Sequence, residues 1–223
     1  MDLVAENISK RYFRKTGGAN YFYAVQPVSL RAPAGAVTVL TGRSGSGKTT
    51  LLHMLAGLLT PTEGKVFLGD TDLYTLGDAA LSRLRNEKIG VVPQGRSAVD
   101  TLTVWENILL PAQLYGRPAP EAAAAAWMER LGIKDLSDAR PAQLSGGELR
   151  SMAVARALAQ DPDIVFADEP TGDLDDENTR TVLSALQAAA RQGKGVFLVT
   201  HESEALRYAD RAFRMDRGVL AEL

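Results

Sequence analysis

The stretch G-R-S-G-S-G-K-T, residues 42–49, decides the fold of this 223-residue chain. It matches the pattern G-x-x-x-x-G-K-[ST], in which backbone N–H groups cradle phosphates at the start of a helix. We expect Lys48 to reach the β- and γ-phosphates and the hydroxyl of Thr49 to bind Mg²⁺. The predicted phosphate-binding set is Gly42, Arg43, Ser44, Gly45, Ser46, Gly47, Lys48, Thr49 and Thr50.

The segments on either side of this loop have the pattern that a phosphate loop requires. Residues 36–41 form an apolar, β-branched run that is typical of a buried central strand. Residues 49–58 have helical spacing and place Leu51, Leu55 and Leu58 on one side. Because strand, glycine loop and helix follow in that order, a phosphate loop is favoured over a glycine-rich turn with a chance lysine.

The composition indicates one globular α/β domain, or one domain that carries a subdomain. Hydrophobic residues make up 45% and charged residues 23% of the chain, close to globular averages, so disorder is not expected. The formal charge of −2 gives no electrostatic reason to expect a nucleic-acid partner. Cysteine is absent, which excludes disulfides and fits a reducing compartment.

The sequence shows no secretory signal and no membrane-spanning run. Its N-terminus, M-D-L-V-A-E-N-I-S-K-R-Y, lacks the apolar core of a signal peptide. No apolar run approaches the roughly 18–20 residues that span a bilayer. We therefore expect any role at a membrane to depend on a partner, reached from the cytoplasmic side.

Two short alternating segments near the N-terminus predict an antiparallel flank. Residues 3–9 and 25–31 alternate apolar and polar side chains, as half-buried strands do. Gly17, Gly18 and Asn20 are expected to form the turn between them.

Helical patterns in the middle of the chain predict an inserted subdomain. Residues 101–115 and 121–132 have helical spacing, and a further helix is expected to run to about residue 159. The predicted fold class is α/β: a P-loop core with a mixed sheet, flanking helices and an antiparallel flank. Residues 97–158 are expected to form the helical subdomain, inserted into a core of residues 1–96 and 159–223.

The α/β pattern resumes after the predicted insertion. Strands are expected at residues 164–168 and 196–200, with a helix over 177–192 between them. A last hairpin is expected to turn at residues 216–218.

Two adjacent carboxylates stand at the carboxyl end of the predicted strand at residues 164–168. Asp168 stands at its carboxyl end, where α/β sheets bind ligands, and is expected to act in the second shell of Mg²⁺. Glu169 follows and is expected to polarise a water for attack on the γ-phosphate. The alternative is that Glu169 is an ordinary loop acid.

Further motifs, in order and at family spacing, show that the chain resembles ATP-binding cassette (ABC) ATPases. They are Gln94 in V-V-P-Q, L-S-G-G-E at residues 144–148, D-E-P-T-G-D-L-D from Asp168, and V-T-H ending at His201. With the phosphate loop they cover essentially the whole chain. Alone, the Gln would be a loop residue and the His a strand-end residue.

The resemblance implies a role for each matching residue. Gln94 is expected to sense Mg²⁺ and the γ-phosphate and to link the site to a transmembrane partner, and His201 to contact the γ-phosphate. Asp175 is expected to reach across a dimer interface, with Asp173 beside it. The signature residues implied to bind ATP held by a second copy of the chain are Ser145, Gly146, Gly147 and Glu148.

The family also implies an aromatic side chain that stacks on adenine. Tyr12, in S-K-R-Y, best fits that position, and Tyr21, Phe22 and Tyr23 are the alternatives. The chain departs from the family at Leu149, where a glutamine is usual. It also departs in the polar segment 95–100, which lies where the partner's cytoplasmic helices normally dock.

The segment at residues 101–111, T-L-T-V-W-E-N-I-L-L-P, is similar to that of one subgroup of the family. This subgroup comprises the ATPases of lipoprotein release, macrolide export, antimicrobial-peptide detoxification and cell-division control. This resemblance implies ATP and Mg²⁺ as cofactors, integral membrane permease subunits as partners, and a location on the cytoplasmic face of the inner or plasma membrane. The alternative is a soluble ABC ATPase of cofactor or cluster assembly. A P-loop kinase or GTPase lacks support, because no N-K-x-D motif is present.

Overall fold

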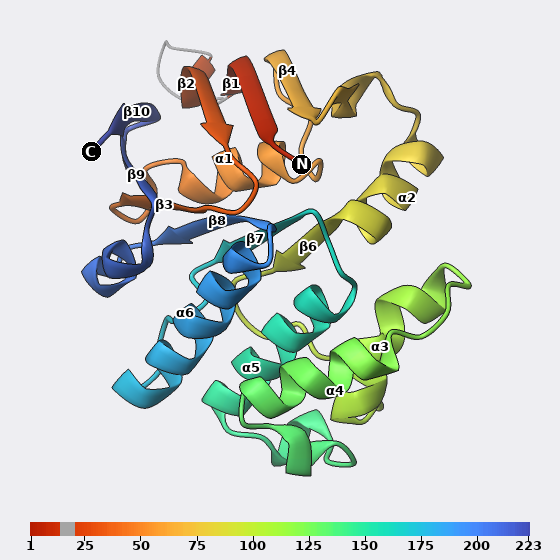
Figure 1. The fold of residues 1–223 in the computed structure, drawn as a ribbon. Helices are drawn as coiled ribbons and strands as arrows, with labels where there is room; N and C mark the ends of the chain where they lie inside the picture. The colour runs from red at the N-terminus through yellow and green to blue at the C-terminus, as the bar shows by residue number, and fades with distance from the viewer. Residues whose placement is uncertain (14–20) are drawn as a thin grey trace.

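The computed structural model describes residues 1–13 and 21–223, which form two β-sheets and the helices around them (Figure 1). The turn predicted at Gly17, Gly18 and Asn20 lies outside these described residues.

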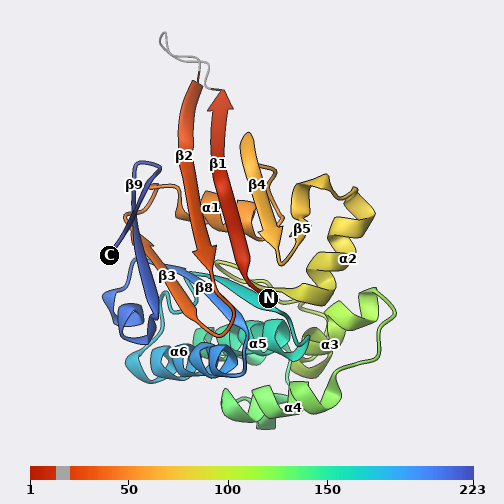
Figure 2. The same ribbon diagram turned by 45° about the horizontal axis from the view of Figure 1, so that its top comes forward.

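One sheet is antiparallel throughout and has the strand order β2-β1-β4-β5. Its strands are β1 (Leu3–Phe13), β2 (Tyr21–Ala32), β4 (Glu63–Leu68) and β5 (Thr71–Asp72). β1 and β2 pair along their whole length and project as a long ribbon beyond the rest of the molecule (Figure 2). The two predicted strands of the antiparallel flank are present, and both are longer than predicted.

The second sheet is mixed and has the strand order β10-β9-β3-β8-β7-β6. All neighbours are parallel except β9 and β10, which form the predicted C-terminal hairpin. The strands are β3 (Val37–Gly42), β6 (Ile89–Val92), β7 (Ile164–Asp168), β8 (Gly195–Thr200), β9 (Arg211–Asp216) and β10 (Val219–Glu222). Because β9, β3, β8 and β7 are parallel neighbours, the loops that follow them meet along one edge of the sheet.

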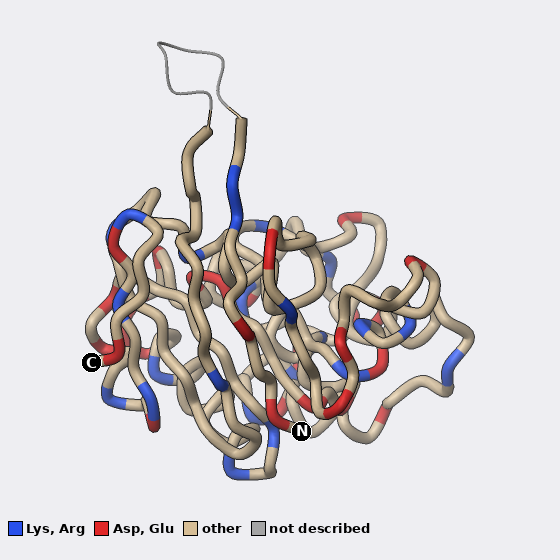
Figure 3. The backbone as a smooth tube through the Cα atoms, turned by 90° about the horizontal axis from the view of Figure 1, so that it is seen from above, with Lys and Arg blue, Asp and Glu red and all other residues tan. Residues whose placement is uncertain are grey.

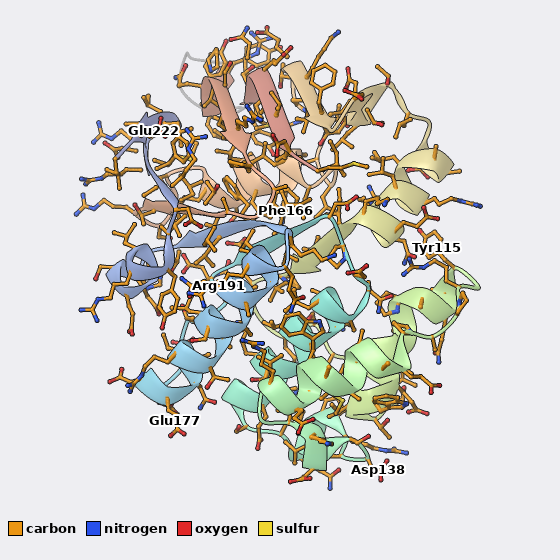
Figure 4. All side chains as sticks on the ribbon, viewed as in Figure 1. Tyr115, Asp138, Phe166, Glu177, Arg191 and Glu222 are labelled. Carbon is orange, nitrogen blue, oxygen red and sulfur yellow. The ribbon has the colours of Figure 1, made fainter. Side chains whose placement is uncertain are left out.

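Side chains from alternate positions of the central strands pack into two separate cores. Phe166 of β7 and Phe197 of β8 are fully buried, with ring centroids 6.0 Å apart, in the core shared with the antiparallel sheet and α1 (Lys48–Leu55). Figure 4 shows Phe166 near the middle of the molecule. Val165 and Leu198 point the other way, into the core covered by α5 (Gly146–Ala159) and α6 (Asp176–Arg191).

Three helices between β6 and β7 lie to one side of both sheets (Figure 1). They are α3 (Val104–Leu114), α4 (Glu121–Arg130) and α5. α3 begins with a capping box, in which Thr103 and Glu106 satisfy each other's backbone N–H groups. The predicted helical subdomain is thus present, whereas its boundaries at residues 97 and 158 stay a prediction.

The helix after the phosphate loop is shorter than predicted. α1 ends at Leu55, and Gly57 follows it with a φ of 68°, a conformation that ends helices. Leu58, which the helical spacing placed with Leu51 and Leu55, is instead 48% exposed.

Several further elements were not predicted. α2 (Asp78–Lys88) has no fully buried residue, although Leu81 and Leu84 pack against the core shared with the antiparallel sheet. It leads directly into the four-residue β6. Short 3₁₀ turns occupy Leu73–Thr75, Lys134–Leu136, Pro141–Gln143 and Ser203–Tyr208.

Charged residues of both signs are interspersed over the surface (Figure 3). No helix within residues 1–13 and 21–223 is long and apolar enough to cross a membrane.

Candidate active site

A cleft of about 840 Å³ opens where the phosphate loop follows β3. Its walls come from β2, the phosphate loop, the segment after β6, the ends of β7 and β8, and the β9–β10 turn. The lining residues are Phe22, Tyr23, Ala24, Arg43, Ser44, Gly45, Ser46, Gly47, Lys48, Thr49, Thr50, Gln94, Glu169, His201, Arg217 and Gly218. The structure therefore brings together the predicted phosphate loop and three residues predicted at the γ-phosphate: Gln94, Glu169 and His201.

The phosphate loop requires glycine at the point where α1 begins. Gly47 has a φ of 107°, and a Cβ there would stand 2.2 Å from the Ala24 carbonyl oxygen of β2. Lys48 folds back over the loop, and its ammonium donates to the carbonyl oxygens of Gly42 and Arg43 at 2.8 and 3.1 Å. These two hydrogen bonds hold Lys48 against the backbone of the phosphate loop.

Glu169 is held in a strained conformation at the side of the cleft. It is a non-glycine residue with a φ of 47°, which costs free energy and is common at functional sites. Its Oε2 lies 2.9 Å from His201 Nδ1 and accepts the His201 N–H at 3.2 Å. Its Oε1 lies 3.9 Å from Lys48 Nζ. This mostly buried carboxylate therefore stands between the phosphate-loop lysine and an exposed histidine ring.

Asp168 is a buried carboxylate beside the start of α1. It is 2% exposed, and its Oδ1 has no hydrogen-bond partner among the described residues. Burial raises its pKa above the ordinary value, although a hydrogen bond from Thr49 and the charge of Lys48 act against this rise. A buried acceptor without a donor or cation is costly and is typical of a site prepared for a ligand.

We expect Asp168→Asn to stabilise the protein in the absence of nucleotide. Because the folded-state pKa is raised, ionised Asp168 lowers stability at neutral pH, and the loss disappears as pH falls towards the ordinary pKa of about 3.9. Thermal unfolding at pH 7 should show a higher melting temperature for the variant than for the parent. The gain should shrink in acid. A lower melting temperature at pH 7 would contradict this account.

The predicted signature residues do not line the cleft. Ser145 caps α5 and accepts the Glu148 N–H at 3.3 Å, while Glu148 Oε2 accepts the Ser145 N–H at 2.7 Å. Ser145 and Gly146 are exposed, so the first turn of α5 presents free amides to solvent. The structure thus keeps this predicted anion site apart from the phosphate loop of the same chain.

Asp175 and the signature residue Gly147 both lie beside Asn178. Asp175 caps α6, where the backbone and side-chain nitrogens of Asn178 both donate to its carboxylate at 2.8 Å. These bonds lower the pKa of Asp175. A Cβ at Gly147 would stand 2.8 Å from the Asn178 side chain, so any larger residue there would have to displace Asn178. Asp173, with a φ of 63°, lies in the turn before α6.

Polar side chains of α3 and α5 hold the backbone on both sides of Gln94. From α5, Arg150 donates to the Pro93 carbonyl at 2.9 Å, and Arg156 donates to the Ser97 carbonyl at 2.8 Å. Asn107 of α3 is fully buried and bonds the backbone of residues 99–103 through four hydrogen bonds. Leu149, the departure from the family pattern, packs against the helical core.

The structure places the aromatic candidates differently from one another. Phe22 and Tyr23 line the cleft, whereas Tyr12 does not, and its ring instead stacks on Phe22 at a centroid distance of 5.9 Å. Tyr21 packs edge-on against Phe13. Which ring stacks on adenine stays a prediction.

The cleft residues Ala24, Arg217 and Gly218 were not predicted from the sequence. The glycine marked a turn, but no local pattern indicated that the turn would meet the phosphate loop more than 150 residues away. Only sheet order, with β9 beside β3, brings them together.

Comparisons with known proteins agree with the predicted resemblance. Residues 25–172 match the family model for "ABC transporter". The "Lipoprotein-releasing system ATP-binding protein LolD" of Aquifex aeolicus is 40% identical over 218 residues, which cover 97% of this chain and 94% of that protein. The "Macrolide export ATP-binding/permease protein MacB" of Chlorobaculum tepidum is 36% identical, covering 97% of this chain and 33% of that protein.

A solved structure shows the same fold over almost the whole chain. It is the dimeric structure of a post-hydrolysis state of the ATP-binding cassette MJ0796 bound to ADP and Pi. The TM-score is 0.88 at 31% identity, covering 99% of this chain and 98% of that chain. The predicted fold class is confirmed.

Proposed function

This chain belongs to the ABC transporter family, and we propose that it is the ATP-hydrolysing subunit of a complex in which two copies close around two ATP molecules and drive a membrane permease. The observation that carries the proposal is the cleft in which the phosphate loop faces the Glu169–His201 pair.

The cleft has the groups that a nucleoside triphosphate such as ATP requires. Backbone N–H groups of the loop and of the first turn of α1 supply an anion site, and Lys48 adds a positive charge. Ser46 Oγ is buried and has no partner among the described residues, as expected of a hydroxyl kept for a phosphate oxygen. The polyphosphate chain would therefore lie along residues 43–50.

The residues beside Lys48 also fit Mg²⁺. Mg²⁺ prefers oxygen ligands and is commonly held by one or two protein side chains together with substrate phosphates. Thr49 and Gln94 line the cleft, and the Asp168 carboxylate joins them because it accepts a hydrogen bond from Thr49, while its Oδ1 has no partner among the described residues. Bound there, Mg²⁺ would neutralise charge on the β- and γ-phosphates.

Glu169 is the group best placed to activate water. Its carboxylate is mostly buried, is held by two contacts with His201 and lines the cleft, which supports a role as the general base beside the γ-phosphate. His201 keeps an exposed ring edge with which to contact that phosphate. Lys48 therefore contributes positive charge and His201 orients Glu169, which accepts the proton.

The site of one chain is incomplete without a second chain. The signature residues Ser145, Gly146, Gly147 and Glu148 face solvent or α6 and not the cleft. We assign them, with Asp175, to the γ-phosphate held by the other copy. The dimeric state of the similar cassette supports this assignment.

Dimer formation is testable with the Glu169→Gln variant, which should bind ATP without hydrolysing it. Light scattering at saturating Mg-ATP should show twice the 23.9 kDa chain mass. Adding Gly146→Asp should keep the protein monomeric, because the new carboxylate repels the phosphate while a Cβ at Gly146 meets nothing within 4 Å. A monomeric Glu169→Gln protein at saturating Mg-ATP would contradict the proposal.

The names of the relatives support a permease partner. One relative belongs to a lipoprotein-releasing system and the other is a macrolide exporter that includes its own permease. We propose that this chain binds a permease at the cytoplasmic face of a membrane and that the buttressed segment 95–100 is part of the contact. Co-expression of a tagged chain with the neighbouring permease gene should recover both proteins from membranes. Recovery of the chain alone would favour the soluble alternative.

A further inference from the structure

The turn between β9 and β10 places Arg217 at the nucleotide cleft, and the family motifs provide no role for it. Its side chain is exposed, and no hydrogen bond or ion pair joins its guanidinium to any other residue in the described part of the chain. Arg211, in the same hairpin, instead pairs with Glu222. The cation at the cleft is therefore free to meet a ligand.

The backbone of the turn is fixed to two walls of the cleft. The Gly218 N–H donates to the Ser46 carbonyl at 2.8 Å, and the Gly218 carbonyl accepts the Gln26 N–H at 2.8 Å. Gly218 is buried, and a Cβ there would stand 3.1 Å from the Ala24 carbonyl oxygen. Arg217 is thus anchored between the phosphate loop and β2.

Arg217 adopts a backbone conformation that suits glycine better. Its φ is 46°, in the left-handed region that costs an arginine free energy. Glycine would fit without this cost, so the arginine reduces stability at this position. Such outliers concentrate at ligand sites, where the side chain compensates for the strain.

The strand order of the mixed sheet indicates which end of a bound nucleotide would lie beside Arg217. Along the edge the strands run β9-β3-β8-β7, so the Arg217 turn lies on one side of the phosphate loop. His201 and Glu169, which follow β8 and β7, lie on the other side. Lys48 is bonded to the loop and faces Glu169. The γ-phosphate therefore belongs at the Glu169 side, and the adenosine side of the nucleotide falls next to Arg217.

We propose that the Arg217 guanidinium binds the α-phosphate of ATP and of ADP, as a cation of the same chain on the adenosine side. The proposal rests on the function proposed above. It predicts that Arg217 contributes to nucleotide affinity independently of the γ-phosphate, and that it helps to retain ADP as well as ATP.

The sharpest test is Arg217→Gly, which removes the guanidinium and relieves the backbone strain together. ATP and ADP affinities, measured by calorimetry on the Glu169→Gln background to prevent turnover, should both fall about tenfold. The melting temperature without nucleotide should be equal to or slightly above that of the parent. Arg217→Ala should show the same loss of affinity without the gain in stability.

A matched control and a salt series separate the possible outcomes. Arg83→Ala removes an exposed cation from α2, outside the cleft, and should leave affinity unchanged. For an ionic contact, the ratio of parent to Arg217→Gly affinity should shrink as NaCl rises. Unchanged affinity, a loss restricted to ATP, or a salt-independent ratio would each overturn the α-phosphate assignment. If the parent binds neither nucleotide, the proposed function itself fails, which is a distinguishable result.

Discussion

Replacing Glu169 with glutamine is expected to slow ATP hydrolysis roughly 10²–10⁴-fold, which is about 3–5 kcal/mol of activation free energy. The amide has nearly the shape of the carboxylate and can still accept the His201 N–H, so the local backbone should be preserved. It cannot take a proton from water. Binding of ATP should survive, because the phosphate loop and Lys48 are untouched.

The measurement is steady-state phosphate release, with ATP affinity determined on the same preparation. Glu202→Gln is the matched control: Glu202 lies next to His201 in sequence, accepts the Thr171 hydroxyl and does not line the cleft. The control should stay within a few-fold of wild type. A Glu169→Gln rate equally close to wild type would make Glu169 an ordinary loop acid and remove it from the mechanism.

The parts of the site that could be predicted are those encoded by short-range chemistry. The phosphate loop is a continuous motif, Asp168 is the last residue of a strand whose five residues are all buried, and Glu169 follows directly. In both cases the residues that act together are adjacent in sequence, and the flanking apolar runs identify the element that carries them.

Elements without a strong apolar pattern could not be predicted. α2 has no fully buried residue, and only Leu81 and Leu84 of the helix pack against a core, so its apolar face is too short to give a clear helical pattern. The end of α1 was misplaced because Leu58 continues the helical spacing of Leu51 and Leu55, whereas the positive φ at Gly57 ends the helix. A backbone conformation decided the boundary where side-chain spacing indicated otherwise.

Contacts between distant segments could not be predicted from the sequence, for a different reason. The Gly218–Ser46 hydrogen bond joins the C-terminal hairpin to the phosphate loop, and it exists because β9 pairs with β3. Strand order is a property of the whole sheet and leaves no mark on a local sequence pattern. The same holds for Tyr12 and Phe22, whose relation to the cleft depends on the course of the β1–β2 ribbon.

The phosphate loop should tolerate alanine at Gly45 much better than alanine at Gly47. At Gly47 a Cβ would stand 2.2 Å from the Ala24 carbonyl oxygen, and the φ of 107° disfavours any other residue. We expect Gly47→Ala to lower the free energy of unfolding by about 3 kcal/mol, from left-handed strain plus forced movement of β2 against α1. ATP affinity should fall at least about 100-fold, because the amides at the start of α1 would be displaced.

Gly45→Ala is the control that isolates the clash from the conformational strain. Gly45 also has a positive φ, of 75°, but a Cβ there meets nothing within 4 Å. Its substitution should therefore cost only about 1 kcal/mol. Urea unfolding without nucleotide, followed by ATP titration, measures both quantities. Equal destabilisation by the two substitutions would mean that the loop yields at Ala24, and that the contact between β2 and the phosphate loop does not hold the site in shape.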